Sequence, residues 1–541
     1  MFKSKRLLLL LSLLFAITVV LAACAGDGEP AEDTTDENDS TEDGGGEGAG
    51  SGDNDLVIAV PSDVVSLSPQ GENDTPSTNV RTNIYETLTN LDENQEIIPG
   101  LASSWDNVDD TTWEFQLEEG VTFHDGSDFN AEAVKKSFDR MMDEKVASPY
   151  QFLVEQVESV EVVDDYTVRF NLEYPYAPLL SNLAHGGTGI ISPDAIDADY
   201  EQMEDGGDPD AYINQNPSGT GPFELDEWVP GEKVTIAPFD GYWGENAKLD
   251  SVTFKVVSEQ SSRVAELETG VSDVADQIGP NNLERVDGLP EASLLQEPSV
   301  SVSYIGFNTQ KEPFDDERVR QALSMAVDKD QIIDGVMNGV GLPAIGPIAP
   351  PVFGYDADIE GLPYDVEKAK ELLAEAGYED GFETTIWTND NEQRVDTAVT
   401  LQSQLAEIGV DVKVEELEWG AYLDGTANGE HDMFILGWTT VTADADYGLY
   451  PLFHSSQHGD PGNRSFIADD ELDKLLDDGR RETDAAKRQE IYTEAQERLV
   501  ELAPAMYTHH QEYLLGVKDS VKDFSVDPNG VYQIKSAYIE E

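Results

Sequence analysis

Cysteine is nearly absent from this chain of 541 residues, in which Cys24 is the only one. A single thiol cannot form an internal disulfide, so a disulfide framework is excluded. Basic side chains are also scarce, with 32 Lys and Arg against 110 Asp and Glu, which gives a formal net charge of −78. So acidic a chain disfavours nucleic acid and anionic membrane surfaces as partners. The composition indicates adaptation to salty or alkaline surroundings, and it does not define a fold.

Long apolar runs are absent beyond the N-terminus. Leu7 to Leu21 form one apolar stretch after the positive charges of Lys3, Lys5 and Arg6, and the sequence LAAC ends it at Cys24. This pattern predicts a secretion signal over residues 1–24, because the run is short and wrongly flanked for a membrane span. Its end resembles the lipobox of bacterial lipoproteins, which implies that Cys24 is acylated and becomes the new N-terminus. The alternative is an ordinary cleaved signal in which Cys24 is incidental.

Residues 25–54 contain no Lys or Arg and almost no apolar side chains. Such a segment cannot bury enough surface to offset its ordering entropy. We therefore expect a disordered, self-repelling tether between the lipid and the folded body. Cation buffering by its carboxylates is the functional alternative.

Recognisable catalytic and metal motifs are missing as well. The sequence has no HExxH, CxxC, GxSxG or Walker phosphate loop, and no glycine-rich phosphate fingerprint after a strand. His454 and His458 are four residues apart, and His509 and His510 are adjacent, which leaves metal binding as a minor alternative. The predictions are therefore no enzyme activity, no cofactor and no metal site.

Apolar periodicity predicts a mixed α/β chain. Asn130 is positioned to cap a helix through Val134 and Phe138, and the two alternating runs near 155–172 predict a hairpin. Further on, the strand GFETTIWT, a helix over residues 395–408 and the strand VDVKVEEL form a βαβ unit. The two strands of such a unit should be parallel, with a right-handed crossover.

The segment HDMFILGWTTVTADADYGLYPLF, residues 431–453, carries the candidate site. Met433 to Trp438 read as a buried strand, and Asp444 and Asp446 follow in a polar loop. Open α/β sheets bind ligands outside the carboxyl ends of their strands. Arg394 follows the first strand of the βαβ unit and should face the same crevice. A loop with two solvated aspartates would give the same pattern.

Several blocks in order along the chain resemble the solute-binding lipoproteins of peptide/nickel-family ABC importers, which bind dipeptides and oligopeptides. The blocks include IYETLTNLD, VTFHDGSDFNAEAVKKSFDR, NPSGTGPFELDEWVPGEKVTI and YIGFNTQKEPFDDERVRQALSMAVDKDQII. The resemblance implies a two-lobed α/β fold of the periplasmic-binding-protein type. Lobe one would combine 55–88, 216–307 and 503–541, an α+β subdomain would be inserted at 89–215, and lobe two would span 308–502. The chain would cross between the lobes near Asn308 and Ala503.

The same resemblance implies roles for the candidate residues. Asp444 or Asp446 would bind the ligand ammonium, with Asp444 favoured, although ADAD stands where relatives often have Asp-Pro-Asp. Arg394 would bind the ligand carboxylate, because a guanidinium can do so with two hydrogen bonds. The alternative for Arg394 is a helix-start pairing with Glu392 or Asp396.

Trp438, Trp387 and Trp419 are candidates for the walls of the site because of their residue type and position, whereas Asn73 and Thr75 are candidates by the resemblance. Trp438 would form a side-chain pocket, with Trp387 and Trp419 as weaker candidates and core packing as the alternative for all three. Asn73 and Thr75 would contact the ligand from the other lobe.

The implied function is capture of short peptides at the outer face of the bacterial cell membrane. The protein would be a lipid-anchored monomer that delivers its ligand to an ABC permease by lobe closure. An oligosaccharide or a nickel chelate remains a rival ligand on the same fold. A secreted hydrolase is the rival from another class.

Overall fold

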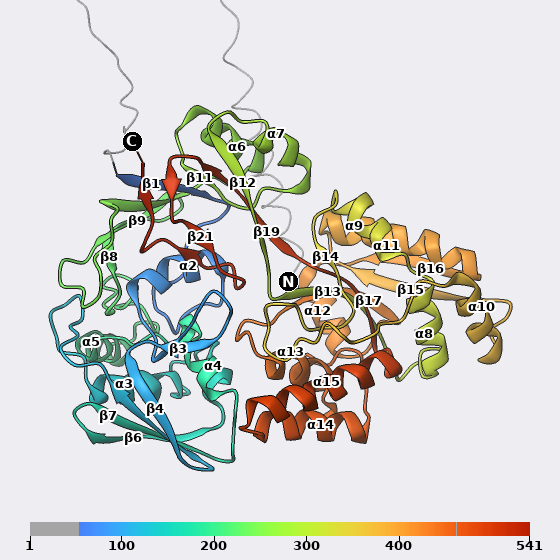
Figure 1. The fold of residues 1–541 in the computed structure, drawn as a ribbon, viewed down its shortest axis with the longest axis horizontal. Coiled ribbons are helices and arrows are strands. Elements are labelled where there is room, and N and C mark those ends of the chain that lie inside the picture. The colour runs from blue at the N-terminus through green and yellow to red at the C-terminus, as the bar shows by residue number, and fades with distance from the viewer. Residues whose placement is uncertain (1–53, 461, 541) are drawn as a thin grey trace, which may run out of the picture. The chain divides into compact units, whose positions relative to one another are not determined.

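A computed structural model describes residues 54–460 and 462–540 of the chain. The expected signal peptide with Cys24, and all but the last residue of the expected tether, lie outside these residues. Two large sheets and one smaller sheet organise the described part (Figure 1).

The first lobe is built on a mixed seven-stranded sheet. In spatial order its strands are β12 (Ala292–Pro298), β19 (Glu512–Lys518), β11 (Val274–Ala275), β1 (Asp55–Val60), β10 (Ser251–Val256), β9 (Lys233–Pro238) and β8 (Phe223–Val229). The lobe's helices are α2 (Thr75–Ile84), α6 (Gln260–Thr269) and α7 (Leu283–Asp287). Two short strand pairs end the chain: β20 (Val521–Lys522) with β23 (Tyr538–Ile539), and β21 (Ser525–Val526) with β22 (Tyr532–Gln533).

The second lobe is built on a six-stranded sheet with helices on both faces. In spatial order its strands are β14 (Leu342–Pro343), β18 (Ala505–His510), β13 (Ser301–Phe307), β17 (Met433–Thr439), β15 (Phe382–Thr388) and β16 (Val410–Glu416). On one face Val302 and Tyr304 pack in a core with α12 (Trp419–Ala427), α13 (Ala445–Phe453), α14 (Asp470–Arg481) and α15 (Ala485–Leu502). On the other face Ile305 and Phe307 pack in a core with α8 (Glu317–Met325), α9 (Lys329–Val336), α10 (Val366–Glu375) and α11 (Glu392–Leu405). Alternation of period two thus divides β13 between two cores.

The predicted βαβ unit is present, because β15 and β16 pair in parallel on either side of α11. β17 also pairs in parallel with β15, from Ile386 opposite Met433. β15 and β17 therefore point the same way, as the sequence predicts. Their carboxyl ends are staggered, because β15 ends at Thr388, one residue after Trp387 pairs with Phe434, whereas β17 continues to Thr439.

The two crossings between the lobes lie elsewhere than expected. β13 and β18 belong to the second sheet, so the chain crosses at Ser299–Val300 and returns at Gln511, not near Asn308 and Ala503. The reason is a continuous antiparallel ribbon: β12 pairs with β19 up to Pro298 opposite Glu512, and β13 pairs with β18 from Ser303 onward. The ribbon passes from one sheet to the next through two short runs without large apolar side chains, QEPS at 296–299 and THHQE at 508–512. Ser299 N–H donates to the Gln511 carbonyl across the crossings at 3.0 Å.

The inserted subdomain has its own four-stranded antiparallel sheet, in the order β4 (Ala102–Asp109), β5 (Thr112–Leu117), β7 (Thr167–Leu172) and β6 (Val157–Asp164). Its helices are α3 (Ala131–Met141), α4 (Leu179–Leu183) and α5 (Pro193–Glu204), and the small pair β2 (Thr89–Leu91) and β3 (Ile97–Pro99) precedes it. Asn130 caps α3 as predicted, since its side chain accepts from the Ala133 N–H. The predicted hairpin is the pair β6 and β7.

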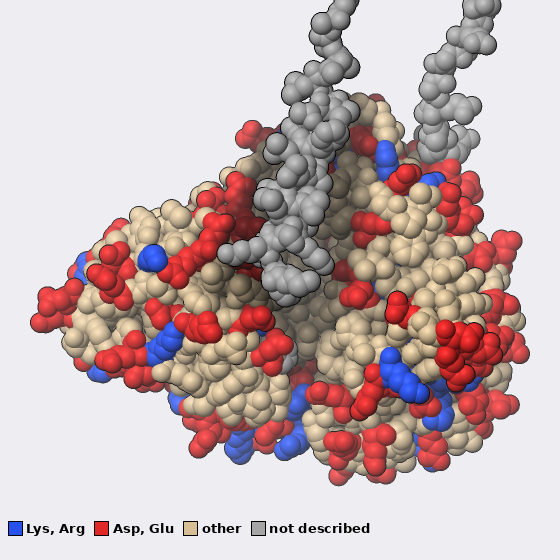
Figure 2. Space-filling view, turned by 180° about the vertical axis from the view of Figure 1, so that it is seen from behind, with Lys and Arg blue, Asp and Glu red and all other residues tan. Residues whose placement is uncertain are grey.

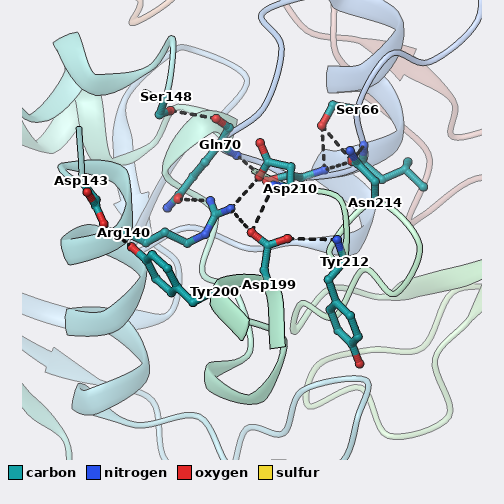
Figure 3. Close-up of polar contacts among 12 residues, drawn as sticks. Ser66, Gln70, Arg140, Asp143, Ser148, Asp199, Tyr200, Asp210, Tyr212 and Asn214 are labelled. Atoms are coloured by element: carbon teal, nitrogen blue, oxygen red, sulfur yellow. Dashed lines mark hydrogen bonds and ion pairs between the residues drawn. The ribbon is translucent and has the colours of Figure 1, made fainter. Parts of the chain in front are cut away.

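A buried arginine joins this subdomain to the first lobe (Figure 3). The Arg140 guanidinium on α3 donates to Asp199 at 2.7 Å, to Asp210 at 2.9 Å and to Gln70 at 2.9 Å. The Asn214 side-chain oxygen also joins the two parts, because it accepts from the Ser66 hydroxyl and from the backbone N–H groups of residues 67 and 68. Because the charge has two carboxylate partners, its burial is compensated.

On the face drawn in Figure 2, acidic side chains far outnumber Lys and Arg. Among the described residues no helix is long and apolar enough to cross a membrane.

Candidate functional site

A cavity of about 660 Å³ lies among the first lobe, the inserted subdomain and the second lobe. Most of its walls come from four places: α2 with the loops on either side, residues 181–186, the segment from β17 into α13, and the C-terminal residues 527–535. Residues of β2 and β3, with Pro222, Tyr242 and Tyr513, complete the lining. The cavity therefore combines segments from both ends and the middle of the chain.

One wall is a row of threonines on α2. Thr75, Thr78 and Thr82 are three and four residues apart, so they lie on one side of the helix. Thr78 and Thr82 donate their hydroxyls to carbonyls one turn earlier, each at 2.9 Å. A hydroxyl oxygen that donates its proton still has two lone pairs, and Thr78 uses one of them to accept from Arg81 Nη2 at 2.9 Å. This wall therefore offers neutral acceptors to a ligand.

The facing wall is aromatic and comes from the second lobe. Trp438 at the end of β17 donates its indole N–H to the Tyr447 carbonyl at 2.9 Å, and the two rings are 5.2 Å apart. Phe152 of the inserted subdomain stacks on Tyr447 at 5.1 Å. Trp438 is thus fixed on the cavity wall, as the sequence analysis expects, and its contact with a ligand stays a prediction.

Asn73 and Thr75, the two candidates from the first lobe, also line the cavity. The Tyr150 hydroxyl donates to the Asn73 side-chain oxygen at 3.3 Å. Asp74 between them caps α2 by accepting from the Ser77 N–H through Oδ1, and its buried Oδ2 has no hydrogen-bond partner.

Asp444 and Asp446 do not line the cavity, because two arginines hold them in the protein interior. Asp444, which is 1% exposed, caps α13 and accepts from both terminal nitrogens of Arg488 at 2.6 and 2.7 Å. Asp446, which is 5% exposed, accepts from Arg480 Nε and Nη2, both at 3.1 Å. Their contact with a ligand ammonium stays a prediction, and this geometry favours a structural role.

The same ion pairs connect the inserted subdomain to the second lobe. Ser181 donates its hydroxyl to Asp444 at 3.3 Å, and Tyr176 donates to Asp446 at 3.2 Å. Burial raises the pKa of the Asp446 carboxyl, against the opposing effect of Arg480. Although burial disfavours the charge of Arg488, the nearby Asp444 carboxylate leaves its pKa above the ordinary value. We call this set of Asp444, Asp446, Arg480 and Arg488 the buried ion-pair cluster.

Arg394 lies at the start of α11 but outside the cavity. It donates to the Asn389 side chain at 3.0 Å, and its guanidinium is 5.5 Å from the centre of the Trp419 ring. Trp387 and Trp419 do not line the cavity either. Carboxylate binding by Arg394 stays a prediction that its position does not favour.

The four histidines considered for metal binding have local hydrogen-bond partners. His454 and His458 bond to the Ser456 hydroxyl at 2.7 Å and the Ile467 carbonyl at 2.9 Å. Burial lowers the pKa of His509 and of His510 to about 4. Within residues 54–460 and 462–540, no three His, Cys, Asp or Glu side chains are grouped so that they could hold a metal ion.

The sequence analysis missed a cavity-lining set formed by Glu86, Tyr242 and Lys535. Tyr242 donates to Glu86 at 2.8 Å and accepts from the Lys535 ammonium at 3.0 Å. Burial raises the pKa of Glu86, against the hydrogen bonds it accepts from Trp243, Thr220 and Tyr242. These residues are far apart in the sequence and form no motif, so only folding brings them together.

Asp527, also on the cavity wall, gives a pH prediction. It accepts from the N–H groups of Asn529 and Val531 at 2.8 and 3.0 Å, and burial raises its pKa to about 6. An aspartate in the unfolded chain has a pKa of about 3.9, so the folded state binds more protons between these values. Asp527 therefore contributes most to stability below pH 4, and this contribution is lost as the pH rises through 6.

Urea unfolding of the wild type and of Asp527→Asn at several pH values measures this effect. The wild type should lose stability relative to the variant between about pH 4 and 6, and the difference should be constant above pH 7. Asp110→Asn, at an exposed turn outside the cavity, is the control. A wild-type to Asp527→Asn difference that does not change with pH would contradict the assignment.

Comparison with known proteins decides the family. Residues 96–460 match the model of the bacterial extracellular solute-binding proteins, family 5 (middle region). The chain belongs to this family. A dipeptide-binding protein of Escherichia coli is 35% identical over 470 residues, which cover 82% of this chain and 86% of the relative. The two-lobed fold is confirmed by solved members of the family.

Solved structures similar to this chain include complexes with peptides. A periplasmic binding protein from Helicobacter pylori in complex with the peptide STSA has a TM-score of 0.75 and 33% identity, and the match covers 90% of this chain and 98% of that one. A dipeptide-binding protein from Pseudoalteromonas in complex with Met-Leu has a TM-score of 0.76 and 26% identity, and the match covers 90% of this chain and all of that one.

Proposed function

We propose that this chain captures short peptides outside the cytoplasm and delivers them to an ABC importer. The observation that carries the proposal is the cavity between the lobes, in a chain whose family includes dipeptide-binding proteins and a relative in complex with the peptide STSA. Pockets of roughly 300–1,000 Å³ suit small ligands, and this one is about 660 Å³.

The chemistry of the walls supports a peptide ligand. Threonine hydroxyls on α2 and the amides of Asn73 and Asn83 offer hydrogen bonds to peptide groups on one side. Trp438 and Tyr447 offer an apolar surface to a ligand side chain on the other. Because neutral hydroxyls and amides bind any peptide backbone, we expect loose side-chain specificity.

Delivery would depend on movement about the two crossings at Ser299–Val300 and Gln511. These are the connections between the two large sheets, and a few residues of this kind can absorb a hinge rotation. A ligand that contacts both walls would stabilise the closed arrangement, which is the form that a permease could recognise. The chain itself would catalyse no reaction.

The N-terminal sequence supports attachment to the outer face of the bacterial cell membrane. Residues 1–24 would be the signal peptide, Cys24 the lipidated N-terminus and residues 25–54 the tether. The high negative charge favours a monomer, because like-charged copies repel each other.

Mass spectrometry of captured ligands tests the function. Residues 55–541 would be incubated with a synthetic library of peptides of two to six residues at molar salt, which screens the acidic surface. After gel filtration, the protein-bound fraction should contain a set of short peptides. A protein that retains no library member, or that copurifies with a sugar or a metal chelate instead, would contradict the proposal.

A further inference from the structure

Lys535 is the only lysine or arginine among the described residues that line the cavity. It follows β22 in the C-terminal segment, and its side chain is exposed. Its ammonium donates to the Tyr242 hydroxyl at 3.0 Å and lies 4.8 Å from the centre of the Tyr242 ring. One hydrogen bond of this kind leaves two of its three N–H donors for other partners.

A chain of hydrogen bonds fixes the position of Lys535, in which Lys535 donates to Tyr242 and Tyr242 donates to Glu86. The Tyr242 oxygen accepts from Lys535, and its own proton is donated to Glu86 Oε1 at 2.8 Å. Glu86 Oε2 in turn accepts from Trp243 Nε1 and from the Thr220 hydroxyl, both at 2.8 Å. Tyr242 is therefore held in place, and it holds the ammonium at the cavity wall.

No carboxylate in the described part of the chain lies within ion-pair distance of Lys535. Other described lysines do have such partners: Lys255 is 2.8 Å from Glu266, and Lys518 is 2.8 Å from Asp273. Lys145 and Lys329 have no carboxylate of the described part at ion-pair distance either, but neither of them lines the cavity, whereas Lys535 does.

The other charged groups of the cavity would select the position of a ligand anion. Asp74, Glu86 and Asp527 line the same cavity and would repel a carboxylate placed beside them. Beside Lys535 that repulsion is offset by an opposite charge and by charge-assisted hydrogen bonds. A ligand carboxylate therefore has one favourable place in this cavity.

We propose that Lys535 is a specificity-determining residue that binds a carboxylate of the captured peptide. This inference rests on the proposed peptide-binding function and names the ligand chemistry: peptides with a free carboxylate, either at the C-terminus or on an acidic side chain. It assigns to Lys535 the role that the sequence pattern suggested for Arg394. The competing explanation is structural, in which Lys535 does no more than balance the charge of Glu86.

A paired peptide library distinguishes these explanations. Each library member, two to six residues long, would be made in two forms, with a free C-terminal carboxylate and as a C-terminal amide. Half of the members would contain one Asp or Glu. Four proteins spanning residues 55–541 would be compared: the wild type, Lys535→Gln, Lys535→Arg and Lys522→Gln. Lys522 is a matched control, because it lies in the same C-terminal segment, pairs with Glu540 at 3.4 Å and does not line the cavity.

The measured quantity is the ratio of free acid to amide among captured peptides. The wild type and Lys522→Gln should enrich free acids about tenfold or more, because the amide cannot accept a charge-assisted hydrogen bond from the ammonium as a carboxylate does. Lys535→Gln should bring the ratio close to one, and Lys535→Arg should keep most of the enrichment. A second outcome would identify a side-chain carboxylate as the ligand group. In that case the wild type would enrich peptides that contain Asp or Glu whether or not they are amidated, and Lys535→Gln would not.

Three results would distinguish failure of the role of Lys535 from failure of the proposed peptide-binding function. Equal enrichment by the wild type and Lys535→Gln would overturn the role of Lys535 while peptide binding stands. Equal capture of all forms by the wild type would overturn it too. A wild type that captures no peptide would contradict the proposed function itself and would remove the basis of this inference. Because each ratio is internal to one protein sample, a partly folded variant changes the yield and leaves the ratio interpretable.

Discussion

Arg488→Met is expected to lower the free energy of unfolding by about 3–5 kcal/mol, because it leaves the Asp444 carboxylate buried without its partner. Asp444 is 1% exposed, and two of its hydrogen bonds come from Arg488. Ser181 at 3.3 Å and the backbone N–H of Asp446 at 2.9 Å would remain as donors. Neither carries a charge, so they cannot replace the guanidinium.

Urea unfolding of two further variants separates the ion pair from a general loss of packing. Asp444→Asn combined with Arg488→Met removes both charges and keeps a side chain that can cap α13, so it should recover more than half of the lost stability. Lys474→Met breaks the exposed pair with Asp478 and should cost about 0–1 kcal/mol. Equal losses for Arg488→Met and Lys474→Met would show that the buried ion-pair cluster contributes no more to the free energy of unfolding than an exposed ion pair does.

Trp438→Ala is expected to weaken peptide binding by about 2–3 kcal/mol, or roughly 30- to 150-fold. The indole is fixed by its hydrogen bond to the Tyr447 carbonyl and lies on the second-lobe wall of the cavity. Its removal would delete a large rigid contact that a ligand side chain would cover. Calorimetric titration with a peptide recovered from the library measures the loss.

Trp419→Ala is the matched control for this prediction. Trp419 is 42% exposed, stacks on Tyr422 and does not line the cavity. Its removal should change peptide affinity by less than about threefold, which is within 1 kcal/mol. If the two tryptophan variants lost affinity equally, the assignment of the cavity as the peptide site would be wrong.

Local sequence patterns predicted the second lobe well. Helical periodicity and the strand patterns of residues 382–388 and 410–416 were sufficient for the βαβ unit, and the parallel pairing of β15 with β16 and β17 confirms it. The cap at Asn130 was also predictable, because an N-cap depends on one side chain and the turn that follows it.

The crossings between the lobes could not be located from local pattern. The strand pairs β12–β19 and β13–β18 form one continuous ribbon across the two sheets. Ser299 is buried whereas Gln511 is exposed, so burial gives no common signal at the two crossings. The sheet that a strand joins depends on its neighbouring strands, which can come from distant parts of the sequence.

The roles of the charged residues were the hardest to predict. Asp444 and Asp446 follow a buried strand, as ligand-binding carboxylates often do, but their partners Arg480 and Arg488 come from α14 and α15, later in the chain. In the same way, Glu86, Tyr242 and Lys535 gather at the cavity from three distant segments. A sequence motif carries no signal for partners that are brought together only by tertiary structure.

The most direct test of the central claim is photo-crosslinking with photo-methionine–leucine, an analogue of the Met-Leu dipeptide in the Pseudoalteromonas relative. Mass spectrometry would locate the crosslinked residues in the chain that begins at residue 55, with and without an excess of unlabelled Met-Leu. We expect crosslinks on both walls of the cavity, on α2 near Thr78 and on the segment from Trp438 to Tyr447, and their loss in the presence of the competitor. Crosslinks confined to other surfaces, or unaffected by the competitor, would contradict peptide capture in this cavity.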